Sequence, residues 1–380
     1  MPLDAPRPTR LRPRPAGRSS LWLRPFTYTL RLLTLGLGLG VLGGTLLSFW
    51  LGSDAKKVGG LTVAASNQPL TWESFFWPSA VSGETGETAL MPLMERPAGL
   101  DEVVALKTEM TPLKQQLLPL LTRNKSINGY LFVADLDTGE YLNLGGDQPV
   151  PAASTIKVPI LIAFFQEVDQ GRVRLDEKLV MRKDLIAGGS GEMQFQAPGT
   201  VYTALETATL MNVISDNTAT NMLIERLGGF EALNQRFREW GLEHTVIRNV
   251  LPDLKGTNTV SPQDMVHLMA LVEKGELLSR RSRDWVLQIM SDTRTRTLLP
   301  QGLGAGARIA HKTGDIGFII GDVGLIDAAN GQRYLMTMFV RRPYDDPQGS
   351  ELLRQVSRLT YAYLTQPRPA AAPPSAPTTP

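Results

Sequence analysis

The sequence predicts an α/β fold, more narrowly an α+β domain, in which an antiparallel sheet is built from both ends of the domain around an inserted all-α lobe. Two observations predict it. Strand-like runs occur near both ends of the domain, at 129–144 and at 308–342. Between them, over roughly 155–300, apolar residues mostly recur at helical spacing, for example at 203–214 and 218–228. We expect a ligand site where sheet and lobe meet, because such sites concentrate at junctions.

Local patterns give the elements of the two ends in order. Leucines at helical spacing predict a helix over about 101–122. The segment 129–144 is expected to form a hairpin, because Asp-Thr-Gly lies between its two apolar halves. Antiparallel strands with Gly-bearing turns are expected within 308–327 and 331–342, and a helix over about 350–364 follows them.

Composition divides the 380 residues into a folded body and its extensions. Residues 52–97 are rich in Gly, Ser, Pro and Thr and lack sustained periodicity, which predicts a flexible spacer. Residues 367–380 are mostly Pro, Ala and Thr and cannot bury a core, which predicts a disordered Pro-rich tail. The folded body is therefore expected to span 98–366.

The beginning of the chain predicts a membrane anchor. Residues 1–31 carry seven Arg and one Asp, and the next twenty residues, 32–51, carry no charge. Twenty helical residues span about 30 Å, the thickness of a bilayer core. Because Arg-rich flanks stay in the cytoplasm, we expect 1–31 to be cytoplasmic and 32–51 to cross the cytoplasmic (inner) membrane once, with the body on the exported, periplasmic side. The alternative is a cleaved signal peptide, whose apolar region usually has about 7–15 residues.

Charge and cysteine content exclude several classes of function. The formal net charge is +2, and residues 1–31 contribute +6, so the rest of the chain is mildly acidic and offers no basic patch for nucleic acid. The chain has no Cys, which excludes disulfides, thiolate catalysis and cysteine metal sites. His244, His267 and His311 lie in no ligand-like spacing, so no metal and no cofactor is expected.

Ser-Thr-Ile-Lys at 154–157 is the first of three short motifs that can carry chemistry. Ser154 follows an extended segment and begins an apolar helix, where free N–H groups favour an oxyanion. Lys157 lies three residues on, so its amine shares a helix face with Ser154 Oγ. A buried lysine near other cations can be neutral and accept the serine proton. Ser154 is thus a candidate nucleophile and Lys157 its base; the alternative is a helix-capping serine beside an ordinary lysine.

Ser-Asp-Asn at 215–217 lies between two helical segments. Ser215 is a candidate relay for a proton on its way to a leaving nitrogen, and Asn217 is a candidate to bind a substrate amide carbonyl. Asp216 is expected to brace the loop. The alternative is a helix N-cap, the ordinary role of these residue types before a helix, and capping does not exclude catalysis.

Lys-Thr-Gly at 312–314 is expected to open a strand. Lys312 and Thr313 are candidates to bind a substrate carboxylate, and the missing side chain of Gly314 lets an acyl group approach the backbone. The N–H of Asp315 is expected to complete an oxyanion hole with the N–H of Ser154. The alternative for this motif is a β-turn.

The order and spacing of the motifs say more than any one of them. Their first positions lie 61 and then 97 residues apart, whereas Ser-x-x-Lys alone is weak, since residues 53–56 also fit it. With GGSGEMQ at 188–194, the set resembles class A β-lactamases and their penicillin-binding relatives over about 105–365. The resemblance implies a β-lactamase/transpeptidase-like fold. It also implies that the serine of the first motif is the nucleophile, with Lys157 and Ser215 as proton carriers.

One segment departs from the class A pattern. Class A β-lactamases carry R-x-E-P-x-L-N in a loop whose Glu and Asn position the water that hydrolyses the acyl-enzyme. The corresponding segment here begins at Arg248 and reads RNVLPDLK, which places Leu251 where the Glu is expected and Lys255 where the Asn is expected. The segment's only carboxylate is Asp253, two positions away. Arg248 and Asn258 are expected to hold the two ends of this loop together.

This departure indicates a smaller class-A-like penicillin-binding group that lacks the glutamate and is thought to act on peptidoglycan stems. We therefore expect a serine acyl-enzyme hydrolase that binds β-lactams and the D-Ala-D-Ala ends of peptidoglycan stem peptides. It would be a D,D-carboxypeptidase or endopeptidase, slow to deacylate after β-lactams and independent of metal or cofactor. The alternatives are a true class A β-lactamase and, from another class, a penicillin or muropeptide sensor that acylates without turnover.

Overall fold

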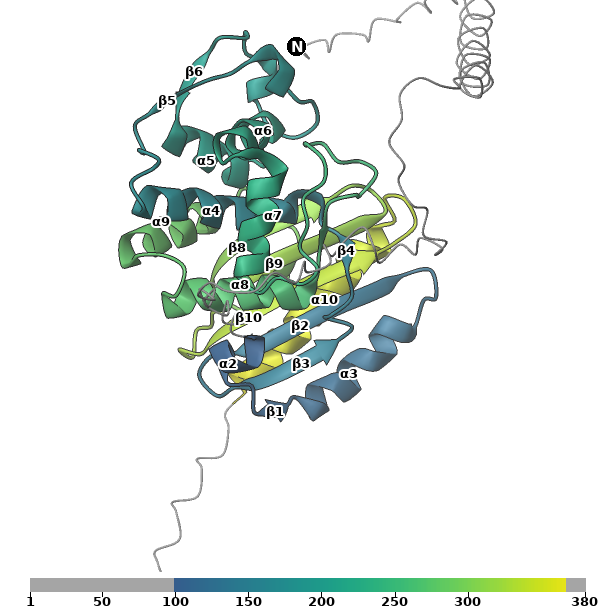
Figure 1. Ribbon diagram of the computed structural model, residues 1–380. Coiled ribbons are helices and arrows are strands. Elements are labelled where there is room, and N and C mark those ends of the chain that lie inside the picture. Colours follow the sequence, from purple (N-terminus) through teal and green to yellow (C-terminus); the bar gives the residue numbers. More distant parts are fainter. Residues whose placement is uncertain (1–98, 367–380) are drawn as a thin grey trace, which may run out of the picture. The chain divides into compact units, whose positions relative to one another are not determined.

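The structure, a computed structural model, describes residues 99–366 (Figure 1). The segments expected to be cytoplasmic (1–31), membrane-spanning (32–51), spacer (52–97) and tail (367–380) lie outside the described residues, and these expectations stay predictions. Within the described part of the chain, no helix is both long and apolar enough to cross a bilayer.

A six-stranded sheet forms the centre of the described domain. Its strands are β1 (Thr108–Glu109), β2 (Asn128–Asp135), β3 (Glu140–Leu144), β8 (Arg308–Asp315), β9 (Ile319–Asp327) and β10 (Arg333–Arg341). They lie in the order β1-β3-β2-β10-β9-β8, and all neighbours are antiparallel except β1, which runs parallel to β3. Strands from the beginning of the domain thus lie beside strands from its end, because β2 pairs with β10.

The inner strands form because they can bury side chains on both faces. Along β10, Leu335 and Phe339 belong to the core on one side of the sheet, and Met336 and Met338 to the core on the other. A strand buried on both faces reads as a continuous apolar run. The segment YLMTMFV within β10 has this character.

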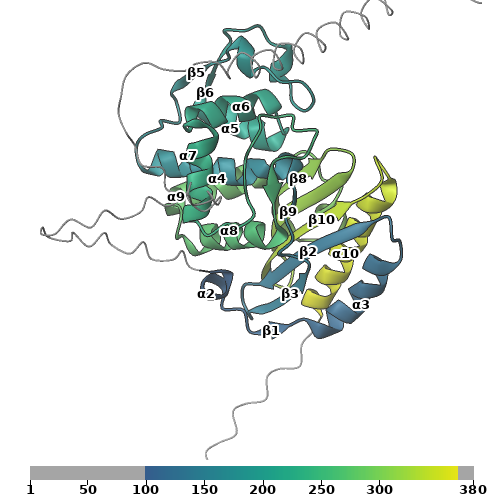
Figure 2. The same cartoon turned by 45° about the vertical axis from the view of Figure 1, so that its right-hand side comes forward.

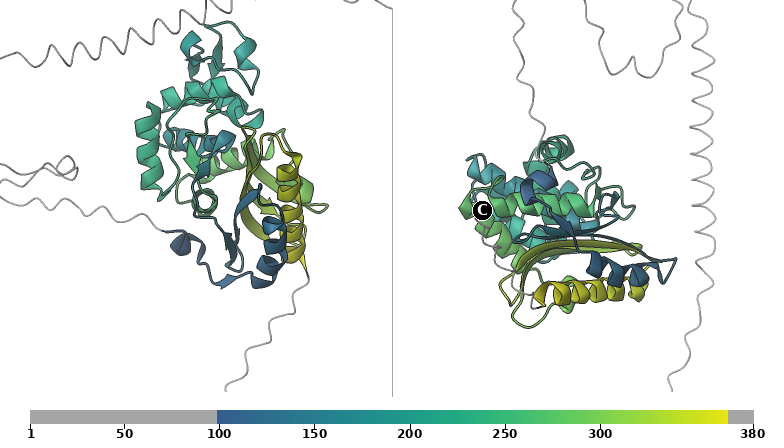
Figure 3. Two further views of the ribbon diagram at one scale, coloured as in Figure 1. Left: turned by 90° about the vertical axis from the view of Figure 1, so that its right-hand side faces the viewer. Right: turned by 90° about the horizontal axis from the view of Figure 1, so that it is seen from below.

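Helices cover both faces of the sheet. On one face lie α3 (Thr111–Thr122) and α10 (Pro347–Thr365), and on the other lie α8 (Pro262–Lys274) and the short α2 (Leu100–Val104). Figures 2 and 3 show the sheet between these two layers. The edge of the sheet opposite β1 is β8, the strand that carries the Lys-Thr-Gly motif.

A helical lobe lies beside the sheet, above it in Figure 1. Its helices are α4 (Lys157–Asp169), α5 (Ala204–Val213), α6 (Asn217–Arg226), α7 (Gly229–Glu239) and α9 (Arg280–Ser291). Two short antiparallel pairs join these helices: β4 (Val150–Pro151) with β7 (Thr259–Val260), and β5 (Lys178–Val180) with β6 (Val201–Thr203). The predicted fold class, a sheet built from both ends around an inserted all-α lobe, is confirmed.

The expected single helix over 101–122 is wrong. The chain forms α2, leaves it through Ala105 in the left-handed region (φ 51°), pairs β1 with β3, and begins α3 with Pro112 in its first turn. A left-handed residue ends a helix and a proline suits the start of one, so two elements form. The leucine spacing holds for α3, where Leu113 and Leu117 are fully buried.

Candidate active site

Ser154 lies in a 3₁₀ turn, η3 (Ala153–Ile156), that runs directly into α4. The chain enters this turn through Ala153, whose φ of 47° is in the left-handed region that non-glycine residues rarely adopt. Such strain gathers at functional sites. Ser154 is half-buried while the three residues after it are buried, so its side chain is the accessible one in the turn.

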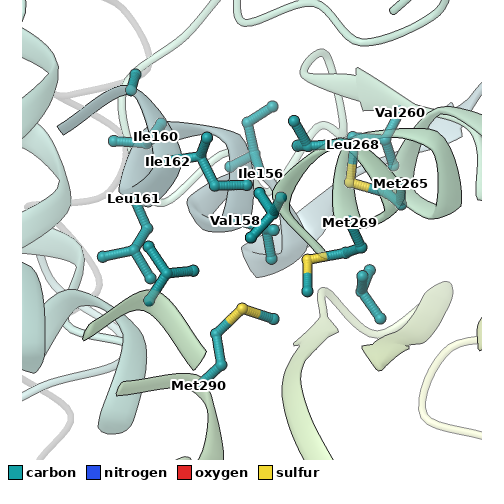
Figure 4. Packing of buried hydrophobic residues seen from close by; sticks show 14 of the residues in the cluster. Ile156, Val158, Ile160, Leu161, Ile162, Val260, Met265, Leu268, Met269 and Met290 are labelled. Carbon is teal, nitrogen blue, oxygen red and sulfur yellow. The ribbon is translucent and has the colours of Figure 1, made fainter. Parts of the chain in front are cut away.

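Apolar packing holds this turn in place. Figure 4 shows side chains of η3 and α4 meeting side chains of α8 and α9 in one buried cluster. Its labelled members are Ile156, Val158, Ile160, Leu161, Ile162, Val260, Met265, Leu268, Met269 and Met290. Because α4 is buried on nearly every side, the hydroxyl of Ser154 cannot drift relative to the neighbouring elements.

The amine of Lys157 lies at the centre of the site. It is fully buried, and its Nζ lies 3.3 Å from Ser154 Oγ, 3.0 Å from Ser215 Oγ, 2.7 Å from the Ser215 carbonyl oxygen and 2.9 Å from Asn217 Oδ1. The last two oxygens can only accept hydrogen bonds, and the Asn217 amide is oriented by donating from Nδ2 to the Gly188 carbonyl. An uncharged amine would spend both N–H groups on these acceptors. Its lone pair would then face the two serine hydroxyls.

The two lysines of the site have different protonation behaviour. Burial lowers the pKa of Lys157 well below its ordinary value, Lys312 lowers it further, and Asp216 opposes both. Burial lowers the pKa of Lys312 to about 8, against the opposing charge of Asp322. Lys312 therefore stays mostly protonated at neutral pH, and the geometry suits Lys157 to act as a base.

The Ser-Asp-Asn motif caps a helix and faces the site at the same time. Asp216 is the N-cap of α6: its Oδ1 accepts a hydrogen bond from the Ala219 N–H at 2.9 Å, and its Oδ2 accepts from the backbone N–H groups of Glu192 (2.7 Å) and Met193 (2.9 Å). The expected bracing role of Asp216 is thus what the structure has. One loop therefore provides both the helix N-cap, Asp216, and the site residues Ser215 and Asn217.

Ser215 bridges the two amines. Its Oγ accepts a hydrogen bond from Lys312 Nζ at 3.1 Å and lies 3.0 Å from Lys157 Nζ. Its φ of 58° is again left-handed, so the backbone is strained to hold this position. A hydroxyl between two amines can pass a proton in either direction, which is the property that the proton-relay prediction needs.

The Lys-Thr-Gly motif ends β8 rather than opening a strand, and the β-turn alternative is wrong. Strand β8 begins at Arg308, four residues before the motif, because the apolar segment upstream of Lys312 is already buried. A Cβ atom at Gly314 would lie 2.9 Å from the Ser154 backbone nitrogen and 3.0 Å from the Thr155 nitrogen. Only glycine therefore lets the edge strand approach the nucleophile's turn this closely.

The two backbone N–H groups that the sequence predicts for an oxyanion hole are those of Ser154 and Asp315. Ile316 N–H donates to the Ile319 carbonyl across the β8–β9 turn, and Gly314 pairs with Gly321. Because hydrogen-bonded pairs alternate in an antiparallel ladder, the N–H of Asp315 points away from β9, toward the free edge. The Ser154 nitrogen lies beside that edge, so the two predicted donors are on neighbouring segments, and the oxyanion hole that they would form stays a prediction.

Leu251 is held beside this site by α6. Asn221 Oδ1 accepts a hydrogen bond from the Leu251 N–H, and Asn221 Nδ2 donates to the Leu251 carbonyl, both at 2.9 Å. Asn221 lies one helical turn after Asn217, which contacts Lys157. Leu251 is 4% exposed and belongs to the apolar core, so the position expected for a glutamate is filled by a buried hydrocarbon side chain.

The only carboxylate of the loop 248–258 is committed to the loop itself. Asp253 is buried, its Oδ1 accepts from the Thr257 hydroxyl at 2.9 Å, and its Oδ2 accepts from the Asn258 N–H at 2.7 Å. Asn258 in turn accepts from the N–H groups of Arg248 (2.7 Å) and Asn249 (2.9 Å). The expected loop-tying role of Arg248 and Asn258 is confirmed. Both oxygens of Asp253 are thus engaged by groups of its own loop.

Sequence reasoning missed two polar residues next to the site. Asn221 was given no role, although its place one helical turn after Asn217 was a usable signal. Arg342 is 6% exposed and its Nη2 donates to both carboxylate oxygens of Asp315 at 2.8 Å. The signal for Arg342 was a cation directly after a long apolar strand. Among residues 99–366, no group of His, Asp and Glu side chains is arranged to hold a metal ion.

A family comparison identifies the domain. The model of the beta-lactamase enzyme family matches residues 112–364, which is more than half of the chain. The chain belongs to this family. It is therefore a serine hydrolase of the class A β-lactamase and penicillin-binding superfamily, and the resemblance inferred from the three motifs is confirmed.

Curated relatives in the beta-lactamase family are distant in sequence. The chain is 25% identical over 242 residues to Beta-lactamase BRO-1 of Moraxella catarrhalis, a match that covers 60% of this chain and 77% of that protein. It is 26% identical over 260 residues to Beta-lactamase VEB-1 of Pseudomonas aeruginosa, covering 63% of this chain and 87% of that protein.

A solved structure of a family relative is much more similar. PBP-A is 58% identical, with a TM-score of 0.67, and the match covers 68% of this chain and 98% of that one. A leucine-to-glutamate mutant of PBP-A, solved as its acyl-enzyme complex with penicillin G, matches with the same identity and TM-score. An ancestral class A β-lactamase is 27% identical, with a TM-score of 0.62, over 66% of this chain and 99% of that one.

Proposed function

We propose that the protein is a D,D-peptidase that cleaves the D-Ala-D-Ala ends of peptidoglycan stem peptides and is trapped by β-lactams as a long-lived acyl-enzyme. The observation that carries the proposal is the loop 248–258, where Leu251 is buried and Asp253 is tied to its own loop. The sequence match to PBP-A, which forms an acyl-enzyme with penicillin G as a mutant, supports the acylation half.

Acylation follows from the groups around Ser154. Lys157 accepts the hydroxyl proton, and Ser154 Oγ attacks the substrate carbonyl carbon while the N–H groups of Ser154 and Asp315 stabilise the oxyanion. The scissile C–N bond then breaks, and Ser215 passes the proton to the leaving nitrogen. Lys312 and Thr313 hold the substrate carboxylate, and Asn217 the amide of the acyl part. The product is an ester on Ser154.

The two kinds of substrate leave different esters. With a peptide, the terminal D-alanine departs, and water can enter the vacated space, where Lys157 and Ser215 can take its proton. With a β-lactam, the leaving nitrogen stays tethered to the acyl group and occupies that space. Water must then come from the side of Leu251, which offers no carboxylate to activate it, and Asp253 is bound within its own loop. The penicilloyl ester is therefore expected to persist.

Intact-mass measurement tests this proposal. The protein is incubated with benzylpenicillin and, separately, with a stem peptide ending in D-Ala-D-Ala. We expect a stoichiometric penicilloyl adduct that lasts for hours and a steady release of D-alanine from the peptide. An adduct without D-alanine release indicates the sensor alternative instead. Rapid turnover of nitrocefin without a lasting adduct indicates a true β-lactamase, the activity named for several relatives.

We also propose that the body acts on the outer side of the cytoplasmic membrane, anchored by 32–51. The support is the Arg-rich segment 1–31 followed by an uncharged run of bilayer length. A reporter fused after residue 380 is expected to be active only if it works in the exported compartment. A tryptic peptide containing Trp22 in the mature protein supports a retained anchor, and its absence supports a cleaved signal peptide.

A further inference from the structure

The ion pair between Asp315 and Arg342 lies directly beside the oxyanion donors. Asp315 provides one of those donors through its N–H, and its side chain follows Thr313 on the same face of β8, about 7 Å along the strand. Arg342, just after β10, is the buried partner, with 4% of its side chain exposed, whereas 46% of the Asp315 side chain is exposed. Asp315 is thus the solvent-exposed member of the pair.

Arg342 is fixed independently of Asp315. Its Nε donates to the Gly317 carbonyl at 2.9 Å and its Nη1 donates to the Asp346 carbonyl at 3.1 Å. A Cβ atom at Gly349 would lie 2.6 Å from the Arg342 side chain, so a glycine makes room for it. The guanidinium would therefore keep its place if Asp315 lost its charge.

The charge of this pair matters because a substrate carboxylate is expected next to it, at Lys312 and Thr313. Paired, Asp315 and Arg342 add no net charge there. Asp345, 3.6 Å from the same guanidinium, is 69% exposed and lies off the sheet edge. Asp322 is buried against His311 and is the same in every variant considered below.

We propose that Asp315 and Arg342 together determine charge selectivity: Asp315 occupies and neutralises Arg342, so that anionic acyl donors are recognised through Lys312 and Thr313 alone. This inference rests on the proposed acylation by β-lactams. In this proposal the Asp315 side chain weakens binding of the substrate carboxylate, whereas its backbone N–H stabilises the oxyanion. An uncovered guanidinium would attract the same carboxylate.

The test compares acylation by benzylpenicillin with acylation by its neutral methyl ester. The ratio of the two second-order rate constants removes any general effect on the catalytic groups. We expect Asp315→Asn to raise the rate constant for benzylpenicillin relative to that for the methyl ester by about three- to tenfold. This is the effect expected of one additional positive charge near the substrate carboxylate in partly screened surroundings. Arg342→Gln, which leaves the carboxylate unpaired, is expected to lower the ratio by a similar factor. In 1 M salt both shifts should persist in large part, because the Arg342 guanidinium is buried and buried charges are screened much less than exposed ones.

Asp345→Asn is the matched control, since it removes a carboxylate from the same guanidinium on the solvent side; its ratio is expected to stay within twofold of the parent. An unchanged or lowered ratio for Asp315→Asn overturns the inference, and so does an Asp345→Asn ratio that rises equally. If Arg342→Gln does not fold, the two Asp variants decide the question. A parent that benzylpenicillin does not acylate overturns the proposed function, whereas an acylated parent with unmoved ratios overturns this inference alone.

Discussion

Polar side chains are used in opposite ways in two neighbouring parts of this molecule. Around Ser154, the polar atoms of Lys157, Ser215 and Asn217 point at one another and toward the nucleophile. In the loop 248–258, the polar atoms close the loop on itself: Asp253 binds the loop's own backbone. Both parts are well packed, so the difference is one of chemistry and not of order.

The comparison separates the two half-reactions of an acyl-enzyme. The groups that form the ester on Ser154 are all present, strained into place at Ala153 and Ser215. In the proposed function, the position that would carry the group that hydrolyses a tethered ester holds Leu251, which is buried in the apolar core. If the proposed function holds, the site keeps the groups for acylation while the position for deacylation serves packing.

The largest expected effect concerns the nucleophile. Ser154→Ala should abolish labelling by a fluorescent penicillin, because no other hydroxyl in the site has both the amine and the oxyanion donors. Ser53→Ala is the matched control, since Ser53 belongs to the second Ser-x-x-Lys sequence of the chain and should label like the parent. If the Ser154 variant were labelled as strongly as the parent, Ser154 would not be the nucleophile.

Lys157 gives the next largest effect. Lys157→Ala should slow acylation by about 10²–10⁴-fold, the usual contribution of a general base. Lys157→Arg keeps a cation but cannot give up its proton, so it should be about as slow as the alanine variant. Stopped-flow or mass-resolved acylation rates measure both. An arginine variant close to the parent would mean that the charge of Lys157, and not its lone pair, is what matters.

The loop is tested by restoring the missing groups. Leu251→Glu combined with Lys255→Asn should speed deacylation of the penicilloyl ester by about ten- to a hundredfold, below a full general-base contribution because the loop keeps its own geometry. Acylation should change little. Burying a carboxylate costs stability of about 1–3 kcal/mol, so folding is checked first by thermal unfolding. A folded variant whose adduct lasts as long as the parent's contradicts the assigned role of position 251.

The pH dependence of acylation reports the two lysines. The pKa of Lys312 is lowered to about 8, so the cation that holds the substrate carboxylate is present below that pH and is lost as pH rises through it. The rate should therefore fall above about pH 8, approaching tenfold per unit. On the acid side it should fall as Lys157 gains its proton. Lys312→Arg should abolish the alkaline fall, since guanidinium stays charged, and a fall that persists points to another group.

The smallest effect separates loop anchoring from catalysis. Asn221→Ala breaks the two hydrogen bonds to Leu251, and Asn234→Ala breaks a matching pair to Ile247, the residue just before the loop. Each should lower the free energy of unfolding by about 1–3 kcal/mol, measured by urea denaturation. Only the Asn221 variant should also change the lifetime of the penicilloyl adduct. Equal lifetimes in both would show that Leu251 does not control access of water.

The fold and the reacting groups could be predicted because both rest on local patterns. Apolar, strand-like runs predicted β9 and β10, and the three motifs contained every side chain now found around Lys157. The wrong predictions concern features that depend on partners far away in the sequence. The break at Ala105 exists because β1 finds β3, and the start of β8 before Lys312 depends on its pairing with β9. The contacts of Arg342 also depend on distant partners, because its side chain reaches the β8–β9 turn only when β10 ends beside that turn.

The pairing of β2 with β10 has a consequence for the order in which the molecule can be made. These strands meet in the middle of the sheet, yet nearly the whole domain separates them along the chain. Contacts so far apart in sequence form slowly and late. A chain released before residue 333 would carry the nucleophile's turn but no central partner for β2, leaving apolar strand edges open to self-association. Strand β10 must therefore be synthesised before the central sheet can form.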